Sequence, residues 1–543
     1  MFRLKIARII LIIFIVVFSC SCGRDGPSVA DDEHSIENST ATADTSDSGH
    51  TNPVKVNDPD DWVFVSEQSQ FGIIYGIGGM KKEPEGDIVI PGIWTNGERI
   101  SFVRGFSSKG GIRSVVISDG IINVSGFDEC NSLETVSLPG SVRVISSNAF
   151  KDCKNLHSVN FPEGLEIIEN DAFYGCDQLA EKICFPSTLK EIGRSAFRRS
   201  GVTGISFSEM SSPKIMSEAF RECRRLRSLI LPCGTLSEEV FRDCTALEEV
   251  ILPDNLITIP PCCFYGCSAL KEIIISEVVK SIGFSAFVRC ESLKNVEIPP
   301  SVTSIGDGAF DFCSSLEKVI IKGVPRTVWF VGCNKLKRVD IPDGVERVYF
   351  KDCESLESLL IPVTVDDGLH DLDLFSGCPA LRTIEVAEGN RRYRSEKNCV
   401  FDVYTGALVK GCAGSTIPGG TETIEWGAFY GTTGLENIYI PGSVSNIGEF
   451  AFTGCTDLKK ITIGHGITAL GAHMFENCTA LKTVEFTASV SHIGIRAFFG
   501  CSSLETINFT GTKNQWQGIT FSEEWNYEMG KYTVICSDGM IEF

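Results

Sequence analysis

The sequence has few of the residues and motifs from which enzyme active sites are built. Only seven histidines occur in 543 residues, and two of them lie within the first 50. A phosphate-binding P-loop, a nucleophile elbow and an HExxH metalloprotease motif are all missing. Zinc sites need clustered Cys and His at short spacings, and the scattered histidines and regularly spaced cysteines offer none. We therefore predict that the protein is not an enzyme and binds no metal or cofactor.

The sequence also lacks an excess of positive charge. It has 49 Lys and Arg against 70 Asp and Glu, which gives a formal net charge of −21. A nucleic acid would be repelled by this balance, so we exclude general nucleic-acid binding.

Residues 1–19 have the pattern of an export signal. Three basic residues precede an apolar run at 9–18, which is too short to span a bilayer. The stretch VFSCSC follows and resembles the cleavage box of bacterial lipoproteins, with Cys20 as the acylated residue and Cys22 as the alternative. Acyl chains would anchor the mature protein in the cell envelope, at the cell surface in our interpretation. Ordinary signal cleavage with two spare cysteines is the other interpretation.

Residues 20–61 have the composition of a flexible tether. Ten acidic side chains lie between positions 25 and 61, among many Ser, Thr, Asp and Gly. Such a segment has too little apolar surface to offset its ordering entropy. We predict that it is disordered and holds the following body away from a membrane.

A repeat of about 23 residues fills most of the remaining chain. The consensus is AFxxCxxLxx[IV]x[ILF]PxxVxxIGxx, with a cysteine three residues after most of the phenylalanines and a leucine three residues later. The aligned phenylalanines are Phe150, Phe173, Phe197, Phe220, Phe241, Phe264, Phe287, Phe310, Phe330, Phe350, Phe375, Phe429, Phe452, Phe475 and Phe498.

One copy of the repeat is too small to have a core, so its apolar positions must be buried against neighbouring copies. In LETVSLP (133–139) the apolar residues alternate with Thr and Ser, which predicts a short strand that pairs in parallel with the next coil. The proline then ends the strand. The repeat therefore predicts a solenoid.

This pattern resembles the BspA-like leucine-rich repeat family of bacterial surface proteins, as in CTDLKKITIGHGITALGAHMF (455–475). The resemblance implies a leucine-rich repeat solenoid with short parallel β-strands on one face, irregular or short helical return segments, and a cap at both ends. The N-terminal cap would be 62–112, the repeats 113–389 and 425–510, an inserted β-hairpin 390–424, and the C-terminal cap 511–543. The resemblance also implies adhesion to host extracellular matrix or plasma proteins, or to other microbial surfaces.

The periodic cysteines could form a disulfide ladder or be buried free thiols. Cysteines on stacked coils would have parallel Cβ vectors, which makes the disulfide torsion hard to reach, so we favour free thiols that act as small apolar residues. Cys399 and Cys412 flank the expected hairpin, and the sequence does not decide whether they are bridged.

Two sets of outward residues are candidates for contact with a partner. An aliphatic stripe on the open sheet face would suggest a protein partner, although β-branched residues are favoured in strands wherever they point. A basic patch could contact anionic glycan or an acidic protein surface, or be ordinary surface charge. The stripe is Ile230, Ile251, Ile274, Ile320 and Leu360, and the patch is Arg194, Arg198, Arg199, Arg221, Arg224, Arg225 and Arg227.

The stretch DDGLHDLDLF (366–375) gathers carboxylates around His370 and is interpreted as a solvated loop or a weak cation site. Taken together, these features predict a lipid-anchored adhesion protein of the cell surface that binds other proteins. The alternative is a structural spacer of the envelope without a soluble ligand. The sequence identifies neither the ligand, nor the membrane leaflet, nor the oligomeric state.

Overall fold

The computed structural model describes residues 58–70, 72–208, 211–231 and 234–543. The expected signal peptide, Cys20, Cys22 and most of the expected tether lie outside these residues. The last four tether residues do have structure: Pro59–Asp61 form the 3₁₀ turn η1, and Asp61 pairs with Lys82 at 2.8 Å. Over the described ranges, none of the helices has the length and apolar composition that a membrane span needs.

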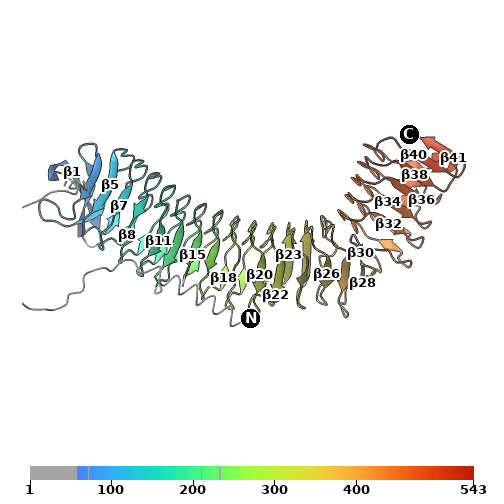
Figure 1. Ribbon diagram of the computed structural model, residues 1–543, viewed down its shortest axis with the longest axis horizontal. Helices are drawn as coiled ribbons and strands as arrows, with labels where there is room; N and C mark the ends of the chain where they lie inside the picture. The colour runs from blue at the N-terminus through green and yellow to red at the C-terminus, as the bar shows by residue number, and fades with distance from the viewer. Residues whose placement is uncertain (1–57, 71, 209–210, 232–233) are drawn as a thin grey trace, which may run out of the picture. The chain divides into compact units, whose positions relative to one another are not determined.

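The chain forms a β-solenoid, and Figure 1 shows its coils following one another in chain order. Most coils contribute to two parallel ladders, which we call the strand-face ladder and the return ladder. The strand-face ladder is the one expected from the alternating LxxVxLP segment. The return ladder is a feature that the sequence did not reveal, because most of its strands have only two residues. The return segments were expected to be irregular or short helical, and the structure has turns and short strands there; α2 (Lys513–Gln517) is the α-helix of the described chain.

The strand-face ladder is divided among five sheets. Its members are β3 (Gly86–Ile90), β5 (Ile112–Ile117), β7 (Thr135–Ser137), β9 (Ser158–Val159), β11 (Lys182–Phe185), β13 (Gly204–Phe207), β15 (Ser228–Ile230), β17 (Glu249–Ile251), β20 (Asn295–Ile298), β22 (Lys318–Ile321), β24 (Val339–Asp340), β26 (Ser358–Ile361), β27 (Thr383–Val386), β32 (Asn437–Ile440), β34 (Lys460–Ile463), β36 (Thr483–Phe486), β38 (Thr506–Phe509) and β40 (Thr533–Cys536).

The return ladder runs through the IG segment that precedes each phenylalanine. Its members are β4 (Ile100–Val103), β6 (Asn123–Val124), β8 (Val144–Ile145), β10 (Ile167–Ile168), β12 (Glu191–Ile192), β14 (Lys214–Ile215), β16 (Thr235–Leu236), β18 (Thr258–Ile259), β19 (Ser281–Ile282), β21 (Ser304–Ile305), β23 (Thr327–Val331), β25 (Arg347–Lys351), β31 (Thr423–Ile424), β33 (Asn446–Ile447), β35 (Ala469–Leu470), β37 (His492–Ile493) and β39 (Thr520–Phe521).

Stacked phenylalanine rings form the centre of the core. From Phe106 to Phe350 the rings of successive coils stack with centroids 4.9 to 6.2 Å apart. The rings between Phe429 and Phe498 stack in the same way at 5.0 to 5.7 Å. Such ring pairs add attraction to the burial of apolar area, which explains why one aromatic residue recurs at this position. The predicted solenoid, in which each copy completes its neighbour's core, is confirmed.

The repeat cysteines are buried free thiols, as we favoured. Most of them donate to the carbonyl of the phenylalanine in the preceding coil; the Sγ of Cys153 lies 3.0 Å from Phe127 O, and that of Cys176 lies 3.1 Å from Phe150 O. A cysteine therefore fills a small apolar site and also links two coils with a weak donor. Cys399 and Cys412 are free thiols as well.

Many coils contain two residues in the left-handed backbone region, two positions before and two positions after the phenylalanine. Glu218, Glu222 and Glu239 occupy such positions with φ of 61°, 61° and 59°. Left-handed backbone is uncommon for residues other than Gly, Asn and Asp, but the turn of this solenoid imposes it on several residue types, including Ser195, Arg289 and Phe312.

Antiparallel pairs occur near both ends of the solenoid and at the insertion. β1 (Trp62–Ser69) pairs with β2 (Gly72–Met80), β28 (Tyr393–Glu396) pairs with β29 (Cys399–Asp402), and β40 pairs with β41 (Gly539–Glu542). β29 also pairs with β30 (Leu408–Lys410), which leads back into the return ladder. Across the insertion, Gly377 N donates to Gly431 O at 3.2 Å, so the flanking coils touch directly.

Candidate binding surface

The predicted aliphatic stripe lies along the strand face, although Ile274 is in a segment that forms no named strand and is joined to β20 by an isolated bridge between Glu272 and Asn295. Ile230 pairs with Ile251 in register, and Ile251 and Ile274 are 42% and 65% exposed. These three residues follow one another on successive coils. Charged residues interrupt the stripe beyond them, because Ile320 pairs with Glu297 on one side and with Asp340 on the other.

Leu360, the last residue of the predicted stripe, is 51% exposed and pairs with Glu385. It is therefore separated from Ile320 by Asp340 and from the following coils by a carboxylate. The stripe consists of one continuous aliphatic patch, Ile230, Ile251 and Ile274, and two isolated aliphatic residues.

A recess of about 560 Å³ lies on the strand face beside the patch, over β20, β22 and β24. β24 has only two residues, and the coils here are shortened to 20 residues. Arg338 pairs with Asp340 at 2.9 Å and Lys337 with Glu357 at 3.5 Å. The recess has apolar, basic and acidic lining residues: Val319, Ile320, Lys318, Lys335, Lys337, Arg338, Glu317 and Asp340.

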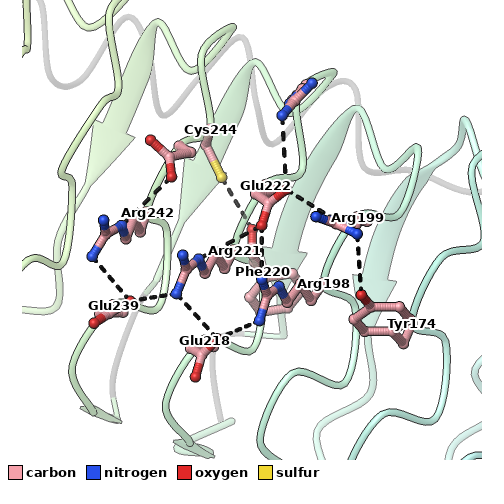
Figure 2. Close-up of polar contacts among 12 residues, drawn as sticks. Tyr174, Arg198, Arg199, Glu218, Phe220, Arg221, Glu222, Glu239, Arg242 and Cys244 are labelled. Atoms are coloured by element: carbon pink, nitrogen blue, oxygen red, sulfur yellow. Dashed lines mark hydrogen bonds and ion pairs between the residues drawn. The ribbon is translucent and has the colours of Figure 1, made fainter.

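Most of the predicted basic patch is part of an ion-pair network that spans three coils (Figure 2). Glu222 lies at its centre, where both oxygens accept hydrogen bonds at 2.9 Å, one from Arg198 and the other from Arg199. Arg224 approaches the same carboxylate at 3.7 Å. Only 9% of the Glu222 side chain is exposed, so this carboxylate is a buried hub for surface arginines.

Two further glutamates extend the network to both sides. Glu218 accepts from Arg194 at 2.8 Å and from Arg198 at 2.7 Å. Arg221 then bridges Glu218 at 3.3 Å and Glu239 at 2.7 Å. We call this set the arginine network: Arg194, Arg198, Arg199, Arg221, Arg224 and Arg242 with Glu218, Glu222 and Glu239.

The arginine network lowers the pKa of two of its glutamates, Glu218 and Glu222. Burial alone would raise the pKa of Glu222, but its hydrogen bonds to Arg199 and Arg198 outweigh this and hold the pKa below the usual value. The pKa of Glu218 is lowered for the same balance of reasons, with Arg194 as its strongest partner. Within the predicted patch, Arg225 and Arg227 are exposed outside the network.

The acidic residues near His370 do not converge on it. Asp371 pairs with Arg347 at 2.7 Å, and Asp373 accepts from Tyr349 and Lys351, both at 2.7 Å. His370 instead lies 3.8 Å from Asp402 of the insertion. Throughout the described part of the chain, no group of three or more metal-ligating side chains is gathered.

Sequence reasoning missed two buried polar residues in the insertion. Asp402 is completely buried and pairs with Arg392 at 2.7 Å. Lys410 is also buried, and its Nζ donates to three backbone carbonyls, those of Asp371 at 2.8 Å, Leu372 at 3.2 Å and Gly427 at 3.2 Å. The only available signal was a lysine within the apolar strand ALVKGC (407–412).

The fold and its exposed strand face define a leucine-rich repeat β-solenoid. The model of the BspA type leucine rich repeat region, in six copies, matches residues 120–248, 234–349, 327–401 and 412–528. The chain therefore belongs to the BspA-type leucine-rich repeat family, and a general role in protein interaction is what this membership supports.

The chain is also similar to several solved structures. A leucine-rich repeat protein from Bacteroides ovatus is 22% identical, with 87% of this chain and 98% of that chain covered and a TM-score of 0.46. A leucine rich cell surface protein from Faecalibacterium prausnitzii is 22% identical over 86% and 98% of the chains, with a TM-score of 0.28. The T. pallidum leucine rich repeat protein is 24% identical over 44% and 91%, with a TM-score of 0.29. No curated protein matches the chain.

Proposed function

We propose that this protein is exported, anchored through an acylated Cys20 or Cys22, and binds other proteins at the cell surface with its strand face. The observation that carries the proposal is the aliphatic patch Ile230, Ile251 and Ile274, in which two side chains are 42% and 65% exposed. A row of aliphatic residues on successive coils presents a continuous apolar surface, and such surfaces mark interaction sites.

The recess beside the patch adds polar complementarity to this surface. Its basic residues Lys318 and Lys335 make no ion pair within the described residues, so their charges are available to a partner. A partner would bury aliphatic area at the patch and place polar or acidic groups along the recess, as in other interfaces with an apolar core and a polar rim. Host matrix or plasma proteins, or proteins of other microbes, are the partners we propose.

The binding test compares two double variants of the mature chain. Ile251→Ser with Ile274→Ser removes the patch, whereas Ile257→Ser with Val278→Ser removes two similarly exposed aliphatic residues outside the strand-face strands. Binding to immobilised matrix proteins and whole cells should weaken by about 2 kcal/mol, or about 30-fold, for the first pair only. Equal binding by both variants would contradict the proposed interface, and no binding by the unmodified protein would favour an envelope spacer.

The anchor and the location are tested separately. Mass spectrometry of the mature N-terminus should find acyl chains on Cys20 or Cys22, and an unmodified N-terminus would refute the lipid anchor. Added protease should cleave the protein on intact cells if it is exposed at the cell surface. Protection from protease until the cells are broken would place it inside the envelope.

A further inference from the structure

A pocket of about 670 Å³ lies where the insertion meets the coil that contains β26. One side is formed by the turn 363–366 and the other by residues 389–392 together with Tyr404, which follows β29. The volume falls in the range of small-molecule sites, about 300 to 1,000 Å³. We call it the insertion pocket.

The residues around the insertion pocket are held in place by part-buried hydrogen bonds. Asn390 donates to the carbonyls of Pro362 and Val365 at 2.8 and 2.9 Å, which ties the insertion to the coil turn. Its Oδ1 accepts from the backbone N–H groups of Arg392 and Tyr393 at 2.9 and 2.8 Å. The backbone that presents the pocket's arginines is therefore fixed before any ligand binds, which lowers the entropic cost of binding.

Asp402 fixes the opposite side of the pocket. This buried carboxylate accepts from the backbone N–H groups of Tyr404 and Thr405 at 2.8 and 3.1 Å. Its second oxygen pairs with Arg392 at 2.7 Å, and the Arg392 guanidinium lies 5.1 Å from the centre of the Tyr404 ring. The charge of Arg392 is thus balanced, and Tyr404 is held beside it although 72% of its surface is exposed.

Arg391 is the free cation of this pocket, since it makes no ion pair with any residue that the structure describes. The pocket therefore offers an exposed aromatic ring, one uncompensated guanidinium, one charge-balanced guanidinium and the carboxylate of Asp366. A guanidinium binds a carboxylate through two parallel hydrogen bonds, and an aromatic face packs against apolar C–H groups.

We propose that the insertion pocket binds a carboxylate-bearing sugar residue, such as a uronic acid, of a surface glycan. The apolar face of the pyranose would pack on Tyr404, its carboxylate would bind Arg391, and its hydroxyls would bind Asp366 and the accessible donors of Arg392. The pairing of one aromatic face with one uncompensated guanidinium in a single pocket favours a compact ring that bears a carboxylate over an extended acidic peptide. This activity is separate from protein binding at the strand face.

The test uses the full mature chain and free glucuronic acid, with glucose as the neutral control, in calorimetry and ligand-observed NMR. Arg391→Gln and Tyr404→Ala should each weaken glucuronate binding by about tenfold or more. Arg394→Gln is a matched control, because Arg394 lies on β28 of the same hairpin but outside the pocket. Arg391→Lys should retain part of the affinity, since it keeps the charge but not the paired hydrogen bonds.

Three outcomes would overturn the proposal: no binding of glucuronate by the unmodified chain, equal affinity for glucose, or binding that neither Arg391→Gln nor Tyr404→Ala reduces. If a short poly-glutamate peptide displaces glucuronate and binds more tightly, the ligand of the pocket is an acidic peptide and the sugar proposal is wrong. The variant with Ile251→Ser and Ile274→Ser should bind glucuronate normally, so a failure at the strand face and a failure at the pocket are distinguished. Thermal unfolding of each variant shows whether it has folded.

Discussion

Replacing Glu222 with glutamine removes one charge from the centre of the arginine network and leaves its shape unchanged. The Glu222 carboxylate is 9% exposed and accepts from Arg198 and Arg199 at 2.9 Å. A hydrogen bond to a charged group contributes about 1.5 to 3 kcal/mol, and removing one partner of a buried pair costs more. Because the arginines are partly solvated, we discount these values and expect a net loss of about 2 kcal/mol.

Hydrogen exchange is the suitable assay, because repeat proteins open locally and a global unfolding midpoint would average over many coils. The amide of residue 222 donates to Arg242 O at 2.8 Å, and that of Phe220 donates to Val240 O at 3.0 Å. A loss of about 2 kcal/mol should accelerate exchange of these amides about 30-fold in the Glu222→Gln variant. Amides beyond the neighbouring coils should exchange at their original rates.

The stabilisation by Glu222 should depend on pH, and this dependence tests the reasoning. The pKa of Glu222 is lowered from its usual 4.5 in the folded state, so its contribution is present above pH 4.5 and is lost as the pH falls through the folded value. The difference between variant and unmodified protein should therefore be largest at neutral pH and disappear in acid. Glu248→Gln is the control, because Glu248 makes a single exposed pair with Lys271 at 2.5 Å and should have little effect. An unchanged exchange rate for Glu222→Gln, or a difference that persists in acid, would show that the network does not stabilise these coils.

Three further predictions concern the core and the insertion. Cys176→Ala removes the donor to Phe150 O and some buried volume, and should cost about 1 to 2 kcal/mol by local hydrogen exchange. Phe241→Ala interrupts the ring stack and should lower the free energy of local opening by about 3 to 5 kcal/mol in the same assay. A loss below about 1 kcal/mol would contradict the packing argument. Burial lowers the pKa of Lys410 from 10.5 to about 7, so the unfolded chain binds an extra proton between these values and stability should rise with pH in this window. The free energy of local opening around residue 410, measured by hydrogen exchange at each pH, should lack that rise in Lys410→Met, and a pH profile identical to that of the unmodified protein would refute the prediction.

The sequence predicted the coil well because its apolar positions recur at a fixed period. The phenylalanine stack, the strand-face strands and the buried thiols all follow from positions that must face neighbouring copies. The return ladder was missed for a physical reason: a strand such as β8 (Val144–Ile145) has two residues, which is too short to show an alternating pattern. Its pairing is imposed by the stacking of adjacent coils.

The surface was less predictable, because it depends on which residues of neighbouring coils come into contact. The sequence showed that arginines cluster at 194–227. It did not show that the side chains of Glu218 and Glu222 contact arginines of the preceding coil. Placing these glutamates requires the offset between a 23-residue coil and the following 21-residue coil. The insertion pocket was missed because its residues lie outside the repeat or at the turn that faces the insertion, where periodicity gives no information.

The thiol links have a consequence for how such a chain can change its length. Because Cys153 and Cys176 make the same contact one coil apart, most coils present equivalent upper and lower surfaces, and a duplicated or deleted copy would meet a neighbour it already fits. The coils of the arginine network are an exception, since Arg198 reaches its partners Glu218 and Glu222 only across a coil boundary. Growth or loss of copies is therefore expected on either side of residues 194–242, while the order of coils within that block stays fixed.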